Sequence, residues 1–462
     1  MPPTPTSRQF TADLDEIEAL ASAPVADAAT LANNLAAIYE RAANAEVGQY
    51  DIAAVTKIAP QIMYRLFDLR MNLRNRLGDF GVRGLMTAEV VQRLRDVFRI
   101  LRYVSDMVGE ISTGNARADG HSPLSGFSGK NHNTLVNWKF YEPGKDHLTF
   151  RSGDVLLVRG QAHNSAAIAR IGDVDSQFSH TGVVYIDSYG RHYMVESLIE
   201  DGAVITPLDE ALKHGIVRAA LYRHRDAYLA SVSAKAIHDY VAKHQGFFAR
   251  PIRYDFSMRP DGGRHLFCSK LVRLAYAMGS GGAYKVPAYM TKMSFKNRDF
   301  LDRIGVKTAE TYAPADIDLE PNFDLVCEWQ DYRETANVRL QDFTLDKLFE
   351  WMETYGYRFQ ETTLVKIVAL LGRFSSTWVK GAKDLISSVV PKVPINMPRK
   401  TIATVAMLHK TAEPIYRELQ QRDAAMVAEA GRPLHGKEVY TILEEIRARD
   451  GAGIGYLARP AV

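Results

Sequence analysis

The sequence predicts an α+β protein in which an antiparallel sheet is flanked along the chain by two helical regions. Apolar residues recur at helical spacing up to about residue 112 and again after residue 334. Short segments rich in Val, Ile and Tyr, separated by turn residues, lie between these two regions. A chain of 462 residues also exceeds the usual span of one hydrophobic core. We therefore expect an N-terminal helical domain (1–112), a linker (113–150), a sheet domain (151–333) and a C-terminal helical region (334–462).

The N-terminal domain is predicted to form several helices, with breaks near Pro24, Gly48 and residues 78–84. The residues with helical spacing include Leu31, Leu35, Ile38, Val91, Leu94 and Leu101. The segment that follows, residues 113–146, is rich in Gly, Ser, Asn and His, which is typical of a loop.

The central domain is predicted to begin with short strands and to end with helices. The expected strands are 153–159, 179–186, 191–196, 203–206 and 216–222. A helix is expected at 227–244, followed by an irregular run and a second helix that begins at Cys268.

Cys268 is a candidate nucleophile because of its place at the start of that second helix. It is one of only two cysteines in the chain. The helix has apolar residues on one side, with Lys270 and Arg273 on the other. A thiol in the first turn of a helix is exposed to the positive end of the helix dipole, which favours the thiolate. The competing interpretation is that Cys268, flanked by apolar residues, is a buried small side chain without chemistry.

A histidine and a glutamate are predicted to lie together on the sheet. Residues 187–190 connect two strands, and Gly190 suits the left-handed last position of a three-residue hairpin loop. That loop places Glu196 opposite Gly182, so that His180 and Glu196 are diagonal neighbours on one face, about 7–8 Å apart between backbones. A two-residue loop would place them on opposite faces.

These residues predict nucleophilic catalysis by a thiol. His180 would accept the proton of Cys268, and Glu196 would orient the imidazole ring and stabilise its charged form. Backbone N–H groups at the start of the Cys268 helix are natural donors to an oxyanion. Each residue alone has an ordinary structural explanation, and their joint occurrence supports the catalytic interpretation.

Five motifs in a fixed order carry a resemblance to a known family. They are Gly153-Asp154-Val155-Leu156-Leu157-Val158, Ser179-His180-Thr181-Gly182-Val183-Val184, Val195-Glu196-Ser197, Tyr254-Asp255-Phe256 and Phe267-Cys268-Ser269-Lys270-Leu271-Val272. The ordered set resembles the YiiX/YebB-like branch of the NlpC-type papain-fold cysteine hydrolases over roughly residues 151–332. That branch is circularly permuted, with the histidine strand before the cysteine helix. The resemblance implies a permuted papain-like core, a site made of Cys268, His180 and Glu196, and no cofactor.

Three further residues are implied to act on the substrate side of this site. Tyr254 and Asp255 match the family pattern upstream of the cysteine. The resemblance implies that these two residues would bind substrate or position the loop. Lys270 departs from the pattern, because relatives commonly carry an acidic residue after Cys-Ser. A lysine there adds positive potential near the thiol, which would lower the thiol pKa further or select an anionic substrate.

Three functions remain open at this stage. The favoured one is hydrolysis of lipid acyl esters or amides. Three features favour it: the permuted order of the motifs, a basic amphipathic segment at 364–390 that suits a membrane surface, and aromatic residues near the site. Those aromatic residues are Phe178, Phe247, Phe248, Tyr254, Phe256 and Phe267. The alternatives are a peptidoglycan amidase or endopeptidase, and an inactive papain-like module that only binds. The amphipathic segment is also explained by ordinary helix packing.

Composition and charge indicate which partners the protein binds and in which cellular compartment it folds. A net charge of +3 disfavours a nucleic-acid partner, and two cysteines fit a reducing compartment. The N-terminus lacks a signal peptide and no apolar run is long enough to span a membrane, so we expect synthesis in the cytoplasm, with export by a signal-independent route if the protein is a secreted bacterial effector. Such an effector would have a neutralising or delivery partner. His163, His192 and His265 with Cys268 match no structural zinc pattern, so no metal site is expected.

Overall fold

A computed structural model of the chain describes residues 10–113, 133–141, 148–213, 215–245, 249–293, 298–360 and 396–459. The amphipathic segment 364–390 lies outside the described residues, as do Phe247 and Phe248.

The N-terminal region is helical, as its apolar periodicity predicts. Its elements are α1 (Phe10–Ser22), α2 (Ala28–Ala43), the 3₁₀ turn η1 (Val47–Gln49), α3 (Ile52–Lys57), α4 (Ala59–Asn75), α5 (Leu77–Val82) and α6 (Ala88–Thr113). Asp27 and Asp51 cap α2 and α3 by accepting hydrogen bonds from backbone N–H groups. The apolar faces of α2, α4 and α6 meet in one core, in which Leu35, Leu66 and Leu94 are buried.

The centre of the fold is an antiparallel sheet, which confirms the predicted α+β class. Within the described residues it has seven strands in the order β1-β11-β6-β2-β3-β4-β5, each antiparallel to its neighbours. The strands are β1 (Thr134–Val136), β2 (Val155–Gly160), β3 (His180–Ile186), β4 (His192–Leu198), β5 (Gly202–Pro207), β6 (Ile216–His224) and β11 (Phe323–Gln330). Strand β1 lies within the segment expected to be only a linker, and it pairs with β11.

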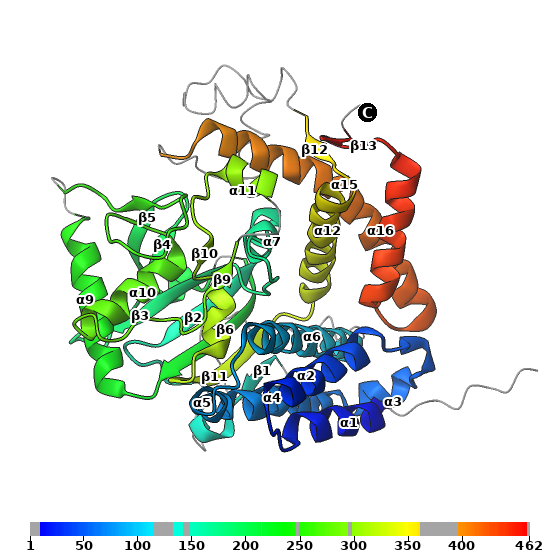
Figure 1. Cartoon of the computed structure of the whole chain (residues 1–462), viewed down its shortest axis with the longest axis horizontal. Helices are drawn as coiled ribbons and strands as arrows, with labels where there is room; N and C mark the ends of the chain where they lie inside the picture. Colours follow the sequence, from blue (N-terminus) through cyan, green and yellow to red (C-terminus); the bar gives the residue numbers. More distant parts are fainter. Residues whose placement is uncertain are drawn as a thin grey trace, which may run out of the picture.

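Helices pack beside this sheet and carry the candidate nucleophile. They are α7 (His163–Ala169), α8 (Leu208–Ala211), α9 (Ala227–Lys243), α10 (Cys268–Gly279) and α11 (Arg298–Ile304). Figure 1 shows α9 and α10 side by side next to β3, and both pack on it, with Leu271 and Val272 of α10 in one core with Val183 and Val195. Short elements complete the region: η2 (Trp138–Phe140), β7 (Arg253–Tyr254), β8 (His265–Leu266), β9 (Thr291–Lys292), β10 (Glu310–Thr311) and η3 (Pro314–Leu319).

The C-terminal region is again mostly helical. It consists of α12 (Thr335–Thr354), α15 (Arg399–Ala430), α16 (Gly436–Asp450) and the small strands β12 (Arg358–Phe359), β13 (Gly453–Ile454) and β14 (Leu457–Ala458). Helices α12 and α15 pack on each other and on α7, which brings this region against the sheet domain (Figure 1). Among the described helices, none is both long enough and apolar enough to cross a membrane.

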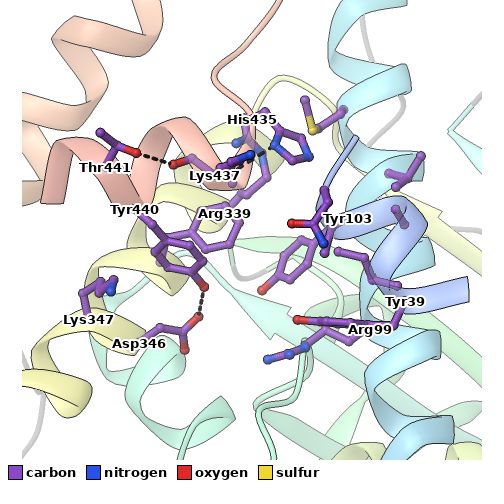
Figure 2. Close-up of a pocket in the computed structure, with 18 of the residues that line it drawn as sticks. Tyr39, Arg99, Tyr103, Arg339, Asp346, Lys347, His435, Lys437, Tyr440 and Thr441 are labelled. Carbon is purple, nitrogen blue, oxygen red and sulfur yellow. Dashed lines mark hydrogen bonds between the residues drawn. The ribbon is translucent and has the colours of Figure 1, made fainter. Parts of the chain in front are cut away.

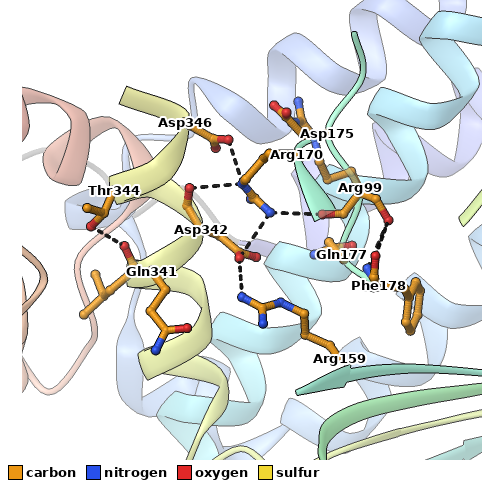
Figure 3. A network of polar contacts seen from close by, with 12 residues as sticks. Arg99, Arg159, Arg170, Asp175, Gln177, Phe178, Gln341, Asp342, Thr344 and Asp346 are labelled. Atoms are coloured by element: carbon orange, nitrogen blue, oxygen red, sulfur yellow. Dashed lines mark hydrogen bonds and ion pairs between the residues drawn. The ribbon is translucent and has the colours of Figure 1, made fainter. Parts of the chain in front are cut away.

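Buried ion pairs fix both helical regions to the sheet. In Figure 3, Asp342 of α12 faces two guanidinium groups, and its carboxylate lies 2.7 Å from Arg159 of β2 and 3.1 Å from Arg170. On the other side, Arg102 of α6 donates to Glu328 of β11 over 2.8 Å. All five side chains are almost fully buried, so each charge depends on its partner for solvation.

Candidate active site

The hairpin between β3 and β4 brings His180 and Glu196 together. Its register places Gly182 opposite Glu196, and Gly190 has a φ of 77°, so the predicted three-residue loop is confirmed. Across this diagonal, His180 Nε2 lies 2.6 Å from Glu196 Oε2. The distance is that of a charge-assisted hydrogen bond, in which the imidazole donates to the carboxylate.

Cys268 is the first residue of α10, at the end of the helix that carries a positive partial charge. Phe267 precedes it and supplies no side-chain cap, so the first-turn N–H groups have no acceptor from within the helix. The thiol is buried, lies 3.8 Å from the Ser269 hydroxyl, and receives a hydrogen bond from the backbone of Thr181 at the start of β3. The helix start and the histidine strand therefore meet at the sulfur.

Electrostatics at this junction favour the thiolate. Burial alone would raise the pKa of Cys268, but the hydrogen bond and the positive charge of His180 outweigh burial and lower this pKa below its ordinary value. Hydrogen bonds from Ser269 and from the Thr181 backbone act in the same direction. The thiolate is therefore favoured although its side chain is almost inaccessible to solvent.

His180 is held in its charged form by groups on both sides of the ring. Burial opposes the charge, but the hydrogen bonds to Cys268 and Glu196 and their negative charges raise the pKa of His180 to about 10. Because Nε2 of His180 is hydrogen-bonded to Glu196, the ring nitrogen that can bond to the thiol is Nδ1. The arrangement is a thiolate–imidazolium pair whose ring is oriented by a buried carboxylate.

Of the three residues expected on the substrate side, Tyr254 is buried and interacts electrostatically with Cys268, whereas Asp255 and Lys270 pair with each other. Burial, followed by the charge of Cys268, raises the pKa of Tyr254. Lys270 Nζ lies 2.7 Å from Asp255 Oδ2, and Asp255 Oδ1 accepts hydrogen bonds from the backbone N–H and the hydroxyl of Ser257. The ion pair balances the Lys270 charge and ties the 249–264 segment to α10. A direct substrate contact of Asp255 or Lys270 stays a prediction.

A small apolar cavity, lined in part by Tyr254, lies between the central domain and the C-terminal region. Its volume is about 70 Å³. Its walls come mainly from α7, α11, α15 and the 254–258 segment, with Ile171 and Ile199 from the turns after α7 and β4. The other apolar members include Ile168, Phe256, Phe300, Ile304 and Leu408, and His163 and His409 are polar members. Cavities of this composition accept hydrocarbon groups readily.

The other residues considered as zinc ligands are not brought together. His192 lies on β4, His265 on β8, and His163 on α7, where it faces His409 and Glu413. Cys327 lies on β11, fully buried, and burial raises the pKa of its thiol well above the ordinary value. It has the features of a structural cysteine. Sequence reasoning missed His409 and Glu413, although their spacing of four residues in a helix places both on one face.

A larger cavity, of about 810 Å³, lies away from the thiol, between α2, α6, α12 and α16. Figure 2 shows Tyr39, Arg99 and Tyr103 on one side and Lys347 and Tyr440 on the other. Its walls contain no residue that the sequence assigned to the site, and many of its charged groups form ion pairs with each other or with their neighbours. It contributes no reactive group to the thiol chemistry.

Comparison with known proteins identifies the segment that carries the site. Residues 149–327 match the family described as permuted papain-like amidase enzyme, YaeF/YiiX, C92 family. No curated protein and no solved structure matched the chain. The match includes His180, Glu196 and Cys268, and the histidine strand precedes the cysteine helix, as the resemblance implied. Residues 149–327 of this chain are therefore similar to the YaeF/YiiX, C92 family of permuted papain-like amidases, and this similarity supports a thiol-dependent hydrolase.

Proposed function

We propose that this protein hydrolyses amide or ester bonds of fatty-acylated substrates through an acyl-enzyme on Cys268. The junction of Cys268, His180 and Glu196 supports the thiol chemistry, and it is the observation on which the proposal depends. The apolar cavity that Tyr254 helps to line supports an acyl group as the part of the substrate that is bound.

The first half of the reaction forms a thioester. The Cys268 thiolate attacks the carbonyl carbon, and the carbonyl oxygen becomes an oxyanion. The N–H groups at the start of α10, which receive no side-chain cap from Phe267, can donate to that oxygen. His180 then gives its proton to the leaving nitrogen or oxygen, the bond from carbon to the leaving group breaks, and an amine or alcohol departs.

The second half restores the thiolate. His180, now neutral, accepts a proton from a water molecule, whose oxygen attacks the thioester carbon. The carbon–sulfur bond breaks, the fatty acid leaves, and Cys268 and His180 return to the thiolate–imidazolium pair. Glu196 keeps its hydrogen bond to Nε2 throughout and compensates the charge of the ring.

A substrate comparison tests this proposal. Purified protein is incubated with phospholipid vesicles, with a long-chain N-acyl amine, with the matching acetylated amine, and with purified peptidoglycan. We expect release of fatty acid from the vesicles or the long-chain amide. A cavity-filling variant, Ile304→Trp, is expected to lower kcat/KM for the long-chain amide by about 10-fold and to leave the acetylated amine unchanged, because Ile304 lines the cavity and not the thiol junction.

Other outcomes contradict specific parts of the proposal. Release of cell-wall peptides without fatty acid would assign the thiol to a peptidoglycan amidase. An equal fall in kcat/KM for both amide substrates in Ile304→Trp would show that the variant damages the fold and not acyl binding. In that case Val405→Phe, on another wall of the same cavity, decides the question. No turnover of any of these substrates would overturn the acyl-hydrolase assignment.

A further inference from the structure

Three metal-binding side chains meet where the C-terminal region contacts the hydrolase domain. His163 is the first residue of α7, and His409 and Glu413 lie one turn apart on α15. One ligand atom from each residue lies within 4.8 Å of the other two. His163 Nε2 is 3.5 Å from Glu413 Oε2, and the two imidazole rings lie 5.0 Å apart, nearly perpendicular.

His163 has an unused nitrogen in this cluster. Its Nε2 is buried, and among the described residues it has no hydrogen-bond partner, since 3.5 Å to Glu413 exceeds a normal hydrogen-bond length. A buried polar atom without a partner carries a free-energy cost that a bound ion would remove. Only 10% of the His163 side chain is exposed, and neutral imidazole is the form that ligates metals.

The third ligand is oriented by a neighbour. Arg417 Nε donates a hydrogen bond of 2.7 Å to Glu413 Oε1, which leaves Oε2 toward His163. Outer-sphere partners of this kind fix the carboxylate of a metal ligand. In a tetrahedral zinc site, ligand atoms at about 2.0–2.1 Å from the ion are about 3.3–3.4 Å from one another. The His163–Glu413 separation of 3.5 Å is close to this size, and the ligand atom of His409 lies within 4.8 Å of both.

We propose that His163, His409 and Glu413 bind one divalent transition-metal ion, Zn²⁺ by the chemistry of the donor set, between α7 and α15. Two imidazoles and one carboxylate suit zinc in preference to Mg²⁺ or Ca²⁺, which prefer oxygen ligands. Both histidines line the apolar cavity that Tyr254 also lines. The ion joins the hydrolase domain, which contains α7, to the C-terminal region, which contains α15. This site is separate from the thiol junction and does not depend on the proposed function.

Zinc binding by the full-length protein tests the site. All proteins carry Cys268→Ala, so that the thiolate cannot itself capture zinc. After treatment with a chelator, each protein is titrated with ZnCl₂ against a fluorescent zinc indicator, and with Co²⁺ for the visible bands of tetrahedral coordination. The test variants add His409→Ala or the isosteric Glu413→Gln. The matched control adds His192→Ala, which removes an exposed histidine on β4.

We expect one equivalent of Zn²⁺ and tetrahedral Co²⁺ bands in the parent and in the His192→Ala control. Affinity should fall by at least about 10-fold in His409→Ala and in Glu413→Gln. Zinc should also raise the thermal midpoint of the parent and not of Glu413→Gln, because an ion that binds only the folded state stabilises it. The site is refuted if the parent binds no zinc, or if Glu413→Gln and His409→Ala bind it as tightly as the parent.

Discussion

Replacing Cys268 with alanine is expected to lower kcat by at least about 10⁴-fold on any substrate that the wild-type protein hydrolyses. The sulfur is the atom that forms the acyl-enzyme, and the only hydroxyl that the described residues place within hydrogen-bonding range of it, that of Ser269, is 3.8 Å away. That hydroxyl is fully buried. Steady-state kinetics with the fatty-acyl substrate, together with intact-mass detection of the acyl-enzyme, measure this loss.

Two further variants show that the loss is specific. Cys327→Ala should keep wild-type kcat, because Cys327 is buried in β11 and its pKa is raised. His180→Ala should lose nearly as much activity as Cys268→Ala, and the double variant should be no worse than either, because the two residues act as one unit. Activity retained in Cys268→Ala, or multiplied losses in the double variant, would contradict the assignment.

Replacing Asp342 with leucine is expected to lower the free energy of unfolding by about 3–5 kcal/mol. Asp342 lies 2.7 Å from the guanidinium of Arg159, which is fully buried, and no other carboxylate of the described residues pairs with Arg159 (Figure 3). Removing the carboxylate leaves a buried cation without compensation. Arg170 keeps a second partner, Asp346, at 2.8 Å, so the damage should come mainly from Arg159. Urea denaturation followed by circular dichroism measures the change in the free energy of unfolding.

A matched variant and a compensating one separate this cause from general damage to α12. Glu350→Gln changes an exposed carboxylate on the same helix, which pairs with Lys347 at 2.9 Å, and should change stability by less than about 1 kcal/mol. Adding Arg159→Met to Asp342→Leu should recover most of the lost stability, because an apolar pair can replace a buried ion pair. If the double variant is as unstable as Asp342→Leu, the unpaired cation is not the cause.

The sequence was most informative where local rules decide the geometry. A three-residue loop ending in Gly190 determines the register of β3 and β4, and that register alone places Glu196 opposite Gly182 and within reach of His180. The strands of the central domain and the helix that begins at Cys268 also follow from patterns within a few residues. For these elements, neighbouring residues contain most of the information.

Contacts between distant segments could not be predicted in the same way. Periodicity placed Lys270 and Arg273 on a polar side of α10, yet both are buried, because Asp255 and Asp261 of the preceding segment pair with them. Strand β1 has three residues in a loop-like segment, and only its pairing with β11 identifies it. The contact of His163 with α15 likewise joins segments far apart in the chain, and a single sequence offers no signal for such a contact.

The pH dependence of Cys268 alkylation tests the central claim, the thiolate–imidazolium pair, most directly. Iodoacetamide labelling followed by intact mass is measured across pH in Cys327→Ala, in Cys327→Ala with His180→Ala, and in Cys327→Ala with Glu196→Gln. Because His180 lowers the pKa of Cys268, we expect labelling of the parent to stay fast below about pH 7, where an ordinary thiol with a pKa of about 8.5 is slow.

Removing His180 leaves burial, which raises the pKa of Cys268, so labelling should then require a pH above that of an ordinary thiol. Glu196→Gln removes a charge that raises the pKa of His180, and should shift the labelling profile toward higher pH by a smaller amount. The opposite result, an ordinary thiol profile in the parent that His180→Ala leaves unchanged, would show that Cys268 is not paired with His180 and would contradict the account of the site.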